Sequence, residues 1–218
     1  MNPKRRIMAN RKIVRVKRST KYSDRIIIVL DDKSVFRIPE DVFVLNVLHE
    51  GDEVTLEEIE SYGKKMRLQE SRDSAFRLLG YRMRSIAEMK KRLKEKKFDP
   101  EEIDQTIDYL IKRKYLDDKE FGEAFVKEKV RNKKIGPRAL KEELYPHHLS
   151  PELTESLIQE VYVEFDPYFL IENHLIKKRI EKNMSFKNKD KKRMTDFLMR
   201  KGFYWDSIQE VYHDWGLI

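Results

Sequence analysis

The sequence of 218 residues contains no cysteine and no long apolar run. Without cysteine the chain can form neither a disulfide nor a thiolate metal site, which fits a reducing compartment. The longest apolar run, Ile26 to Leu30, is far too short to cross a membrane, and the basic first residues lack the apolar segment of a secretion signal. These absences predict a cytoplasmic protein that does not enter a membrane.

Sequence patterns of common active sites are also missing. No G-x-x-x-x-G-K-[ST] or G-x-G-x-x-G stretch offers a phosphate-cradling loop, and the five histidines show no H-E-x-x-H spacing. His147 and His148 are adjacent in an expected loop, which is a weak indication of metal binding. Among 39 acidic residues, no spacing singles out a pair for acid–base catalysis. We therefore expect no metal, no cofactor and no enzymatic activity.

Charge is abundant and unevenly distributed. Residues 1–25 hold ten Lys and Arg residues and one acidic residue, and residues 177–193 hold nine and two. Since the whole chain has a net charge of +8, the rest of it is net acidic. Two basic segments around an acidic middle suit a polyanion at the ends and a protein partner between them. The alternative is that both segments are lysine-rich faces in contact with water.

The first fifth of the chain has the pattern of strands. Residues 12–18 and 25–31 are rich in β-branched side chains, and a polar turn leads to a third run at 35–38, which together predict a small antiparallel meander. A short helix is expected at 40–48, stopped by Gly51. Thr55 and Glu58 form a capping box that opens a long helix towards Gly80, in which Gly63 is a candidate kink.

From about residue 82 onward the sequence repeats a pattern of amphipathic helices. Helices are expected at 82–98, 99–118, 118–132, 137–144, 151–166, 167–183, 189–201 and 205–215. Leu93, Leu144 and Leu198 lie 51 and 54 residues apart, and each is followed five residues later by a large apolar residue: Phe98, Leu149 and Phe203. Two matched offsets at one long period indicate a tandem repeat.

We therefore predict a mainly α protein with three stacked three-helix repeats, curved and elongated, after the N-terminal β meander. The expected parts are residues 1–54 with the meander, 55–118 with the first repeat, 119–166 with the second and 167–218 with the third. Several residues are expected to have structural roles in this array. Ser85 caps a helix with Glu88, Asp117 or Asp118 caps the next repeat, Tyr115 and Leu116 are core anchors, and Gly136-Pro137 starts a helix.

Four of these stretches resemble the RecX family of recombination regulators. They are R-x-x-S at 82–85, Phe98, KYLDDKEF at 114–121 and IGPRALKEEL at 135–144. The resemblance covers roughly residues 70–218, and the N-terminal region is similar to that of longer members. The chain departs from the family pattern at Lys97 and Lys114, where glycine is usual, and at Gly122, where alanine is usual. We expect these changes to affect turns and leave the family assignment intact.

The resemblance implies a non-enzymatic regulator of the RecA recombinase. RecX-like proteins bind the RecA filament on DNA, lie in its helical groove and inhibit or dismantle it, lowering ATP hydrolysis and strand exchange. The implied partners are the RecA filament and single- or double-stranded DNA without sequence preference, contacted by a monomer. A tandem array can touch successive filament subunits, so that several contacts together supply the affinity.

The candidate partner-binding residues are cations in three stretches. They are Lys90, Lys91, Arg92 and Lys94; Lys133, Lys134 and Arg138; and Lys177, Lys178, Arg179, Lys187, Lys189, Lys191, Lys192 and Arg193. In the last stretch, Lys191, Lys192 and Arg193 are expected at a helix start, where cations oppose the helix dipole. An anionic partner explains that placement better than solubility does.

A second class remains open, a stand-alone DNA-binding protein of the helix-turn-helix kind. Residues 89–97, with six cations against Glu95, could form its recognition helix. Met89 and Leu93 argue instead for a core helix, and the stretch has no Asn, Gln or Ser to read bases. A third class, a scaffold without a nucleic-acid role, requires both basic segments to serve solubility alone.

Stacked repeats predict a molecule larger in extent than a compact chain of equal length. Small-angle scattering should give a radius of gyration above the roughly 17 Å expected for 218 residues in one compact body. A radius at or below that value would rule out the stacked array.

Overall fold

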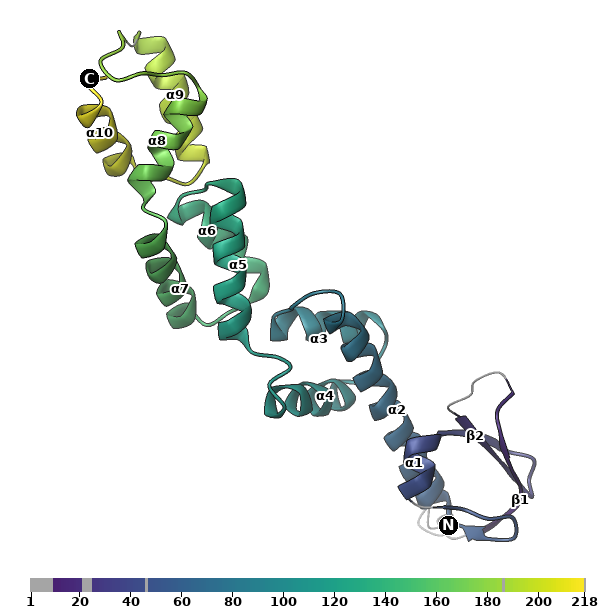
Figure 1. Cartoon of the computed structure of the whole chain (residues 1–218). Helices are drawn as coiled ribbons and strands as arrows, with labels where there is room; N and C mark the ends of the chain where they lie inside the picture. The colour runs from purple at the N-terminus through teal and green to yellow at the C-terminus, as the bar shows by residue number, and fades with distance from the viewer. Residues whose placement is uncertain (1–9, 21–24, 46, 186, 218) are drawn as a thin grey trace, which may run out of the picture. The chain divides into compact units, whose positions relative to one another are not determined.

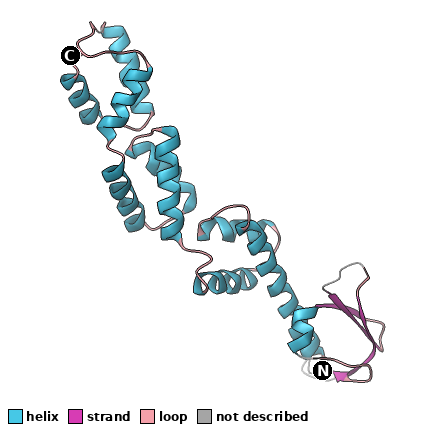
Figure 2. Ribbon diagram, viewed as in Figure 1, coloured by secondary structure: helices cyan, strands magenta, loops and turns pink. Residues whose placement is uncertain are grey.

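The structure, a computed structural model, describes residues 10–20, 25–45, 47–185 and 187–217. Lys4, Arg5, Arg6 and Lys21 of the basic N-terminal segment therefore lie outside the described residues. The chain divides into two compact units, one comprising residues up to 82 together with 90–110 and the other comprising 83–89 and 111–218. Figures 1 and 2 show an N-terminal sheet followed by helices, which confirms the predicted mainly α class with a small β meander. The division into four parts remains a prediction.

The N-terminal sheet has four antiparallel strands in the order β3-β2-β1-β4. They are β1 (Arg11–Arg18), β2 (Arg25–Leu30), β3 (Val35–Pro39) and the two-residue β4 (Glu53–Val54). The three predicted strands are confirmed, with a register irregularity in β1 between Ile13 and Arg15. The sequence analysis missed β4, because two residues are too few to show an alternating pattern.

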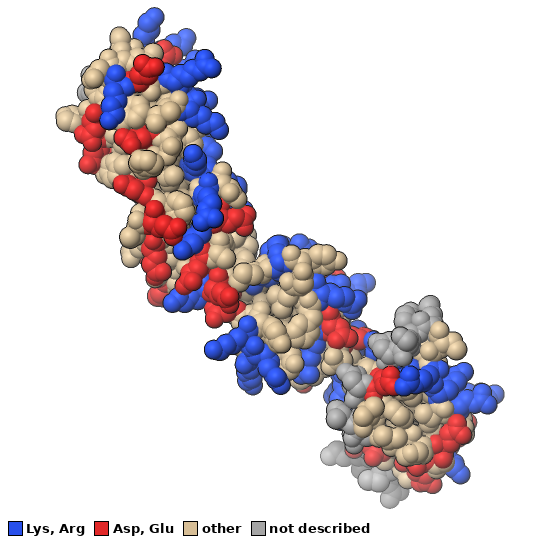
Figure 3. Space-filling model, in the orientation of Figure 1, with Lys and Arg blue, Asp and Glu red and all other residues tan. Residues whose placement is uncertain are grey.

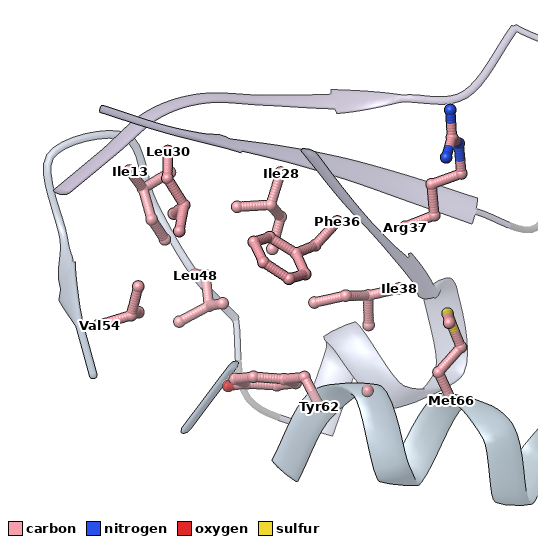
Figure 4. Close-up of a pocket in the computed structure, with 11 residues that line it drawn as sticks. Ile13, Ile28, Leu30, Phe36, Arg37, Ile38, Leu48, Val54, Tyr62 and Met66 are labelled. Atoms are coloured by element: carbon pink, nitrogen blue, oxygen red, sulfur yellow. The ribbon is translucent and has the colours of Figure 1, made fainter. Parts of the chain in front are cut away.

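Two helices cover one face of the sheet. They are α1 (Glu40–Leu45), shorter than the expected 40–48, and α2 (Leu56–Leu79). Thr55 and Glu58 form the predicted capping box, whereas α2 runs through Gly63 without a break. The core of this region contains Ile13, Ile28 and Leu30. Figure 4 shows a small apolar cavity of about 40 Å³ between these strands and α2, beside Tyr62 and Met66.

The next two helices are α3 (Ile86–Glu95) and α4 (Pro100–Lys112). Arg67 on α2 fixes the start of α4: its Nε donates to the Glu102 carboxylate (3.1 Å) and a terminal nitrogen donates to the Lys97 carbonyl (2.9 Å). The buried Thr106 hydroxyl donates to Ser71 Oγ at 2.9 Å. These polar contacts hold α2 against α4.

Six α-helices follow α4 in the described part of the chain. They are α5 (Asp118–Lys133), α6 (Pro137–Leu144), α7 (Pro151–Glu164), α8 (Pro167–Lys177), α9 (Asn188–Arg200) and α10 (Trp205–Asp214), with a 3₁₀ turn η2 (Tyr145–His147) after α6. Their buried residues form one core that runs from Val126 to Leu217. The helix predicted at 167–183 was too long, because the backbone leaves the helix after Lys177. No helix among the described residues is both long and apolar enough to span a bilayer.

The five-residue offset between a leucine and a large apolar residue marks the end of a helix in two of the three repeats. In a Schellman motif, a left-handed residue follows the helix and the next amide donates to a carbonyl five residues earlier. Lys97 (φ 64°) and Gly202 (φ 88°) are the left-handed residues after α3 and α9. The amides of the residues that follow, Phe98 and Phe203, donate to Leu93 and Leu198 at 3.4 and 3.2 Å. At the third position, the 3₁₀ turn precedes left-handed His148 (φ 50°).

A shared role in the core requires the six repeat residues to be buried, and four of them are. Leu93, Leu144, Leu198 and Phe203 are at most 2% exposed. Phe98 and Leu149 are half-buried. The Arg67 guanidinium lies 5.0 Å from the centroid of the Phe98 ring, within range of a cation–π contact.

The segment before and into α6 is bonded through its backbone to three other helices. The Gly136 and Arg138 amides donate to the Lys201 and Gly202 carbonyls at 2.8 and 3.1 Å. The Lys134 carbonyl lies 2.7 Å from His174 Nε2, and the Ile135 carbonyl accepts from the Tyr162 hydroxyl at 2.7 Å. This junction, residues 134–138, satisfies the free amides at the start of α6 with the free carbonyls at the end of α9.

The junction explains Gly136-Pro137, the predicted helix start. A Cβ on Gly136 would lie 2.5 Å from the Gly202 carbonyl oxygen, and a Cβ on Gly202 would lie 2.2 Å from the Ala139 nitrogen. No side chain fits between these backbones. Pro137 lacks an amide, so it leaves no donor unsatisfied at the first helical position.

Truncating a repeat leucine should destabilise the protein strongly. Leu144→Ala removes a side chain that is 2% exposed, and we expect the free energy of unfolding to fall by about 2–5 kcal/mol. Urea denaturation measures the change. The neighbouring Tyr145→Ala, at a side chain that is 78% exposed, is the control and should have an effect below about 1 kcal/mol. Similar midpoints for both variants would contradict the repeat alignment.

Candidate functional site

A cationic groove lies between the end of α8 and α9. It is open to solvent, with a volume of about 710 Å³. Its walls carry Lys178, Arg179, Lys187, Arg193 and Arg200, and its floor is formed by Ile180, Met184, Met194 and Phe197. Figure 3 shows Lys and Arg side chains gathered over this part of the molecule. We call this feature the α8–α9 groove.

The local sequence builds the groove by ending α8 early. Arg179 takes the left-handed conformation (φ 59°), and the Ile180 amide donates to the Leu175 carbonyl at 3.1 Å, a Schellman ending. Ile180 is thereby buried at 9% exposure while Arg179 stays exposed. The Lys178 ammonium lies 5.3 Å from the Phe197 ring centroid, within range of a cation–π contact between the two helices.

None of the five groove cations, Lys178 included, has an acidic partner in the described part of the chain. Among the described residues, no carboxylate pairs with Arg179, Lys187, Arg193 or Arg200 within 4.0 Å, although Asp190 and Asp196 also line the groove. In the second repeat, two of the three candidate cations, Lys133 and Arg138, are paired instead. Both Lys133 and Lys129 reach the Glu143 carboxylate, at 2.6 and 3.4 Å, and Arg138 reaches Glu142 at 3.9 Å. The groove is thus an unsatisfied positive site.

The shared carboxylate Glu143 responds to its two cations. A hydrogen bond from Lys133 holds the pKa of Glu143 below its usual value, against the opposing effect of burial. Lys134 ends α5 in the left-handed conformation (φ 48°), where its carbonyl faces His174. Contacts within the protein therefore hold this stretch in place: ion pairs hold Lys133 and Arg138, and a backbone contact with His174 holds Lys134.

The groove uses only part of the 177–193 segment. Lys177, Lys189 and Lys192 are exposed but do not line it, and the Lys191 ammonium lies 5.8 Å from the Tyr212 ring. Helix α9 begins at Asn188, one residue before the predicted start at 189. Lys187 is the N-cap of α9, without a side-chain capping bond, and Asp190 occupies the first turn, so Lys192 and Arg193 lie beyond the strongest part of the dipole.

Sequence reasoning missed Arg200 and Phe197 in this site. Arg193, Phe197 and Arg200 are spaced four and three residues apart, the spacing that places side chains on one face of a helix. Arg200 was not among the candidates because the basic segment, residues 177–193, was defined by its density of charge alone. Helical periodicity along α9 was the signal that could have found it.

The cations of α3 lie in another part of the chain. Lys90, Lys91, Arg92 and Lys94 are all exposed. Lys90 pairs with Asp104 at 2.9 Å and Arg92 with Glu95 at 3.0 Å. Met89 and Leu93 on the same helix are fully buried, which makes α3 a core helix.

Asp117, Asp118 and Ser85 cap helices in the structure. Asp117 caps α5 by accepting from the Lys119 and Glu120 amides, and Ser85 Oγ accepts from the Glu88 amide at 3.2 Å. Asp118 accepts from the Ile86 amide at 2.8 Å, so this aspartate also caps the start of α3. Burial raises the pKa of Asp118, although the Ile86 hydrogen bond opposes the effect.

Tyr115 was predicted to be a core anchor, and the structure corrects this. Its side chain is 54% exposed, whereas Leu116 is buried at 3%. The turn at left-handed Lys114 (φ 58°) directs only one of the two residues inward.

The sequence and fold are similar to those of known proteins. Family models described as the first and second three-helix domains of RecX match residues 72–110 and 117–157. "Regulatory protein RecX" of Bacillus subtilis (strain 168) is 30% identical over 200 residues, covering 90% of this chain and 74% of the relative. The protein of the same name from Listeria welshimeri is 29% identical over 197 residues, covering 88% and 71%.

Two solved structures share the fold. "Crystal structure of regulatory protein RecX" superposes with a TM-score of 0.73 at 18% identity, covering 93% of this chain and 99% of that one. The crystal structure of RecX from Lactobacillus salivarius gives a TM-score of 0.59 at 19% identity, covering 70% and 98%.

The histidine of the junction should make stability depend on pH. Burial lowers the pKa of His174 below the ordinary 6.5, so the neutral ring is favoured in the folded state. Its contribution is fully present above pH 6.5 and is lost as the pH falls below that value. Urea midpoints of the parent should drop between pH 7.5 and 5.5, and those of His174→Gln, less stable at pH 7.5, should drop less. Equal drops would assign the pH dependence to other groups.

Proposed function

The chain belongs to the RecX family of regulatory proteins, and from that premise we propose that it regulates the RecA recombinase without catalysing a reaction. In this proposal it binds the RecA filament on DNA in the cytoplasm as a monomer. It inhibits or destabilises the filament, and so lowers ATP hydrolysis and strand exchange. Homologous recombination and DNA repair are the processes affected.

The observation that carries the proposal is the α8–α9 groove. Five cations converge on one concave surface, and none of them has an acidic partner within 4.0 Å among the described residues. Guanidinium groups form paired hydrogen bonds with phosphates and carboxylates, so the groove suits the charged surface of a protein–DNA filament. Because such contacts release counterions, they weaken as salt concentration rises.

The other candidate cations have supporting roles in this proposal. Lys133 and Arg138 already have carboxylate partners, so an anionic ligand must compete with Glu143 or Glu142. Lys91 and Lys94 are exposed and available to phosphates. We assign the main anionic contact to the groove and weaker, additive contacts to these residues.

The alternative is a DNA-binding protein that acts without the recombinase. Its recognition helix would be α3, whose exposed residues are mostly lysines that contact phosphates without reading bases. Measuring the salt dependence of DNA binding with and without recombinase separates the two. The alternative predicts the same affinity and slope in both cases, whereas our proposal predicts tighter binding when the filament is present.

Removing the groove cations should weaken inhibition without unfolding the protein. The variant Lys187→Gln/Arg193→Gln/Arg200→Gln changes exposed side chains, so its melting temperature should stay within about 3 °C of the parent. We expect the concentration needed to inhibit recombinase ATP hydrolysis on preformed filaments to rise about tenfold or more. The salt dependence of inhibition should also flatten.

A matched variant controls for net charge. Lys177→Gln/Lys189→Gln/Lys192→Gln removes the same three charges from exposed positions outside the groove. It should retain more of the inhibition than the groove variant does. Equal inhibition by all three proteins across the salt range would show that the groove is only a solvated face and would reject its assignment.

A further inference from the structure

The outer face of the N-terminal sheet carries cations around an apolar centre. Strand pairing places Lys17, Ile27 and Arg37 in one row across β1, β2 and β3, and places Arg15, Val29 and Val35 in the next. The opposite face packs towards α2. Figure 4 shows Phe36 and Ile38 pointing into that core, whereas Arg37 points to the other side of the strand. We call the six residues the outer sheet face.

The cations of the outer sheet face have no acidic partner among the described residues, unlike the other arginines of the strands. Arg15, Lys17 and Arg37 are exposed, and none has a carboxylate within 4.0 Å among the described residues. Other arginines of the strands are paired: Arg11 with Asp32, Arg18 with Glu40 and Arg25 with Glu70.

Carboxylates lie near the edges of the outer sheet face, and Glu70 on α2 lines a cavity together with Val35 and Arg37. The Glu50 carboxylate accepts from the Val16 amide at 3.1 Å, and that of Glu53 accepts from Asn10 at 3.0 Å. No acidic residue occupies an outward position of β1, β2 or β3 in the described part of the chain. The three strands therefore contribute only positive charge to the face.

The centre of the face distinguishes between two kinds of polyanion. Ile27 and Val29 are half-buried and Val35 is 48% exposed. Ile27 lies between Lys17 on β1 and Arg37 on β3, strands that are two strand spacings, or about 10 Å, apart. In the next row, Val29 and Val35 lie beside Arg15. A DNA backbone offers phosphates to the cations but little apolar surface to the centre. A protein interface has an apolar centre and a polar rim, and arginine is enriched in it.

We propose that the outer sheet face docks an acidic protein surface with an apolar patch at its centre. If the proposed function holds, the acidic surface that docks here belongs to the recombinase subunits of the filament. The groove and the outer sheet face lie in different compact units of one chain. Binding through both raises the effective concentration of the second contact once the first has formed.

The test compares binding to filaments with binding to bare DNA. The sheet variant is Arg15→Thr/Lys17→Thr/Arg37→Thr, in which threonine keeps a strand-compatible side chain. The charge-matched control is Lys64→Gln/Lys65→Gln/Lys112→Gln, at exposed helical positions. Co-sedimentation with preformed recombinase filaments should show about tenfold weaker binding for the sheet variant alone. Fluorescence anisotropy with the same DNA free of recombinase should show less than about a twofold change for both variants.

A second variant tests the apolar centre without changing charge. Val35→Thr replaces a half-exposed valine with a residue of similar shape, and it should weaken filament binding several-fold while leaving DNA binding unchanged. An equal loss on bare DNA would identify a nucleic-acid contact and overturn the proposal. Unchanged filament binding by both variants would overturn it as well, leaving a solvated face. Failure of the parent itself to bind filaments would reject the proposed function and this inference together.

Discussion

The backbone junction at residues 134–138 is the constraint on which the C-terminal part of the structure depends. Helix ends leave amides and carbonyls without partners, and burying them unsatisfied is costly. Here the amides that start α6 meet the carbonyls that end α9 directly. This contact requires Gly136 and Gly202, because neither position has room for a Cβ. It fixes the end of α9, and thereby Arg200, relative to the rest of the helical core.

The α8–α9 groove follows from how these helices end. The Schellman ending of α8 buries Ile180 and leaves Lys178 and Arg179 at the rim. Helix α9 then presents Arg193, Phe197 and Arg200 on one face towards that rim. The fold places these cations around one groove without acidic partners among the described residues. An anion that binds in the groove therefore offsets the repulsion between them. A site of this kind favours anionic partners through its charge.

The sequence predicted most of the fold because its signals are local. Three strands, the capping box at Thr55 and the starts at Pro137, Pro151 and Pro167 are written in short patterns. The family departures at Lys97 and Lys114 lie at left-handed positions, so they affect turns, as expected. The expectation was wrong for Gly122, which is buried inside α5, where a Cβ would lie 2.4 Å from the Leu157 side chain. What was missed depends on tertiary contacts. Three features join residues that are far apart in the chain. They are the capping of α3 by Asp118, the close approach of Gly136 and Gly202, and the place of Arg200 in the groove.

The central claim is that the α8–α9 groove contacts the recombinase filament. Hydrogen–deuterium exchange tests it directly, because amide protection reports on a segment without altering its charge. With preformed filaments in excess, exchange should slow across residues 178–200 and return to the free rate when the salt concentration is raised. Unchanged exchange in this segment, with protection confined to other parts of the bound chain, would contradict the claim.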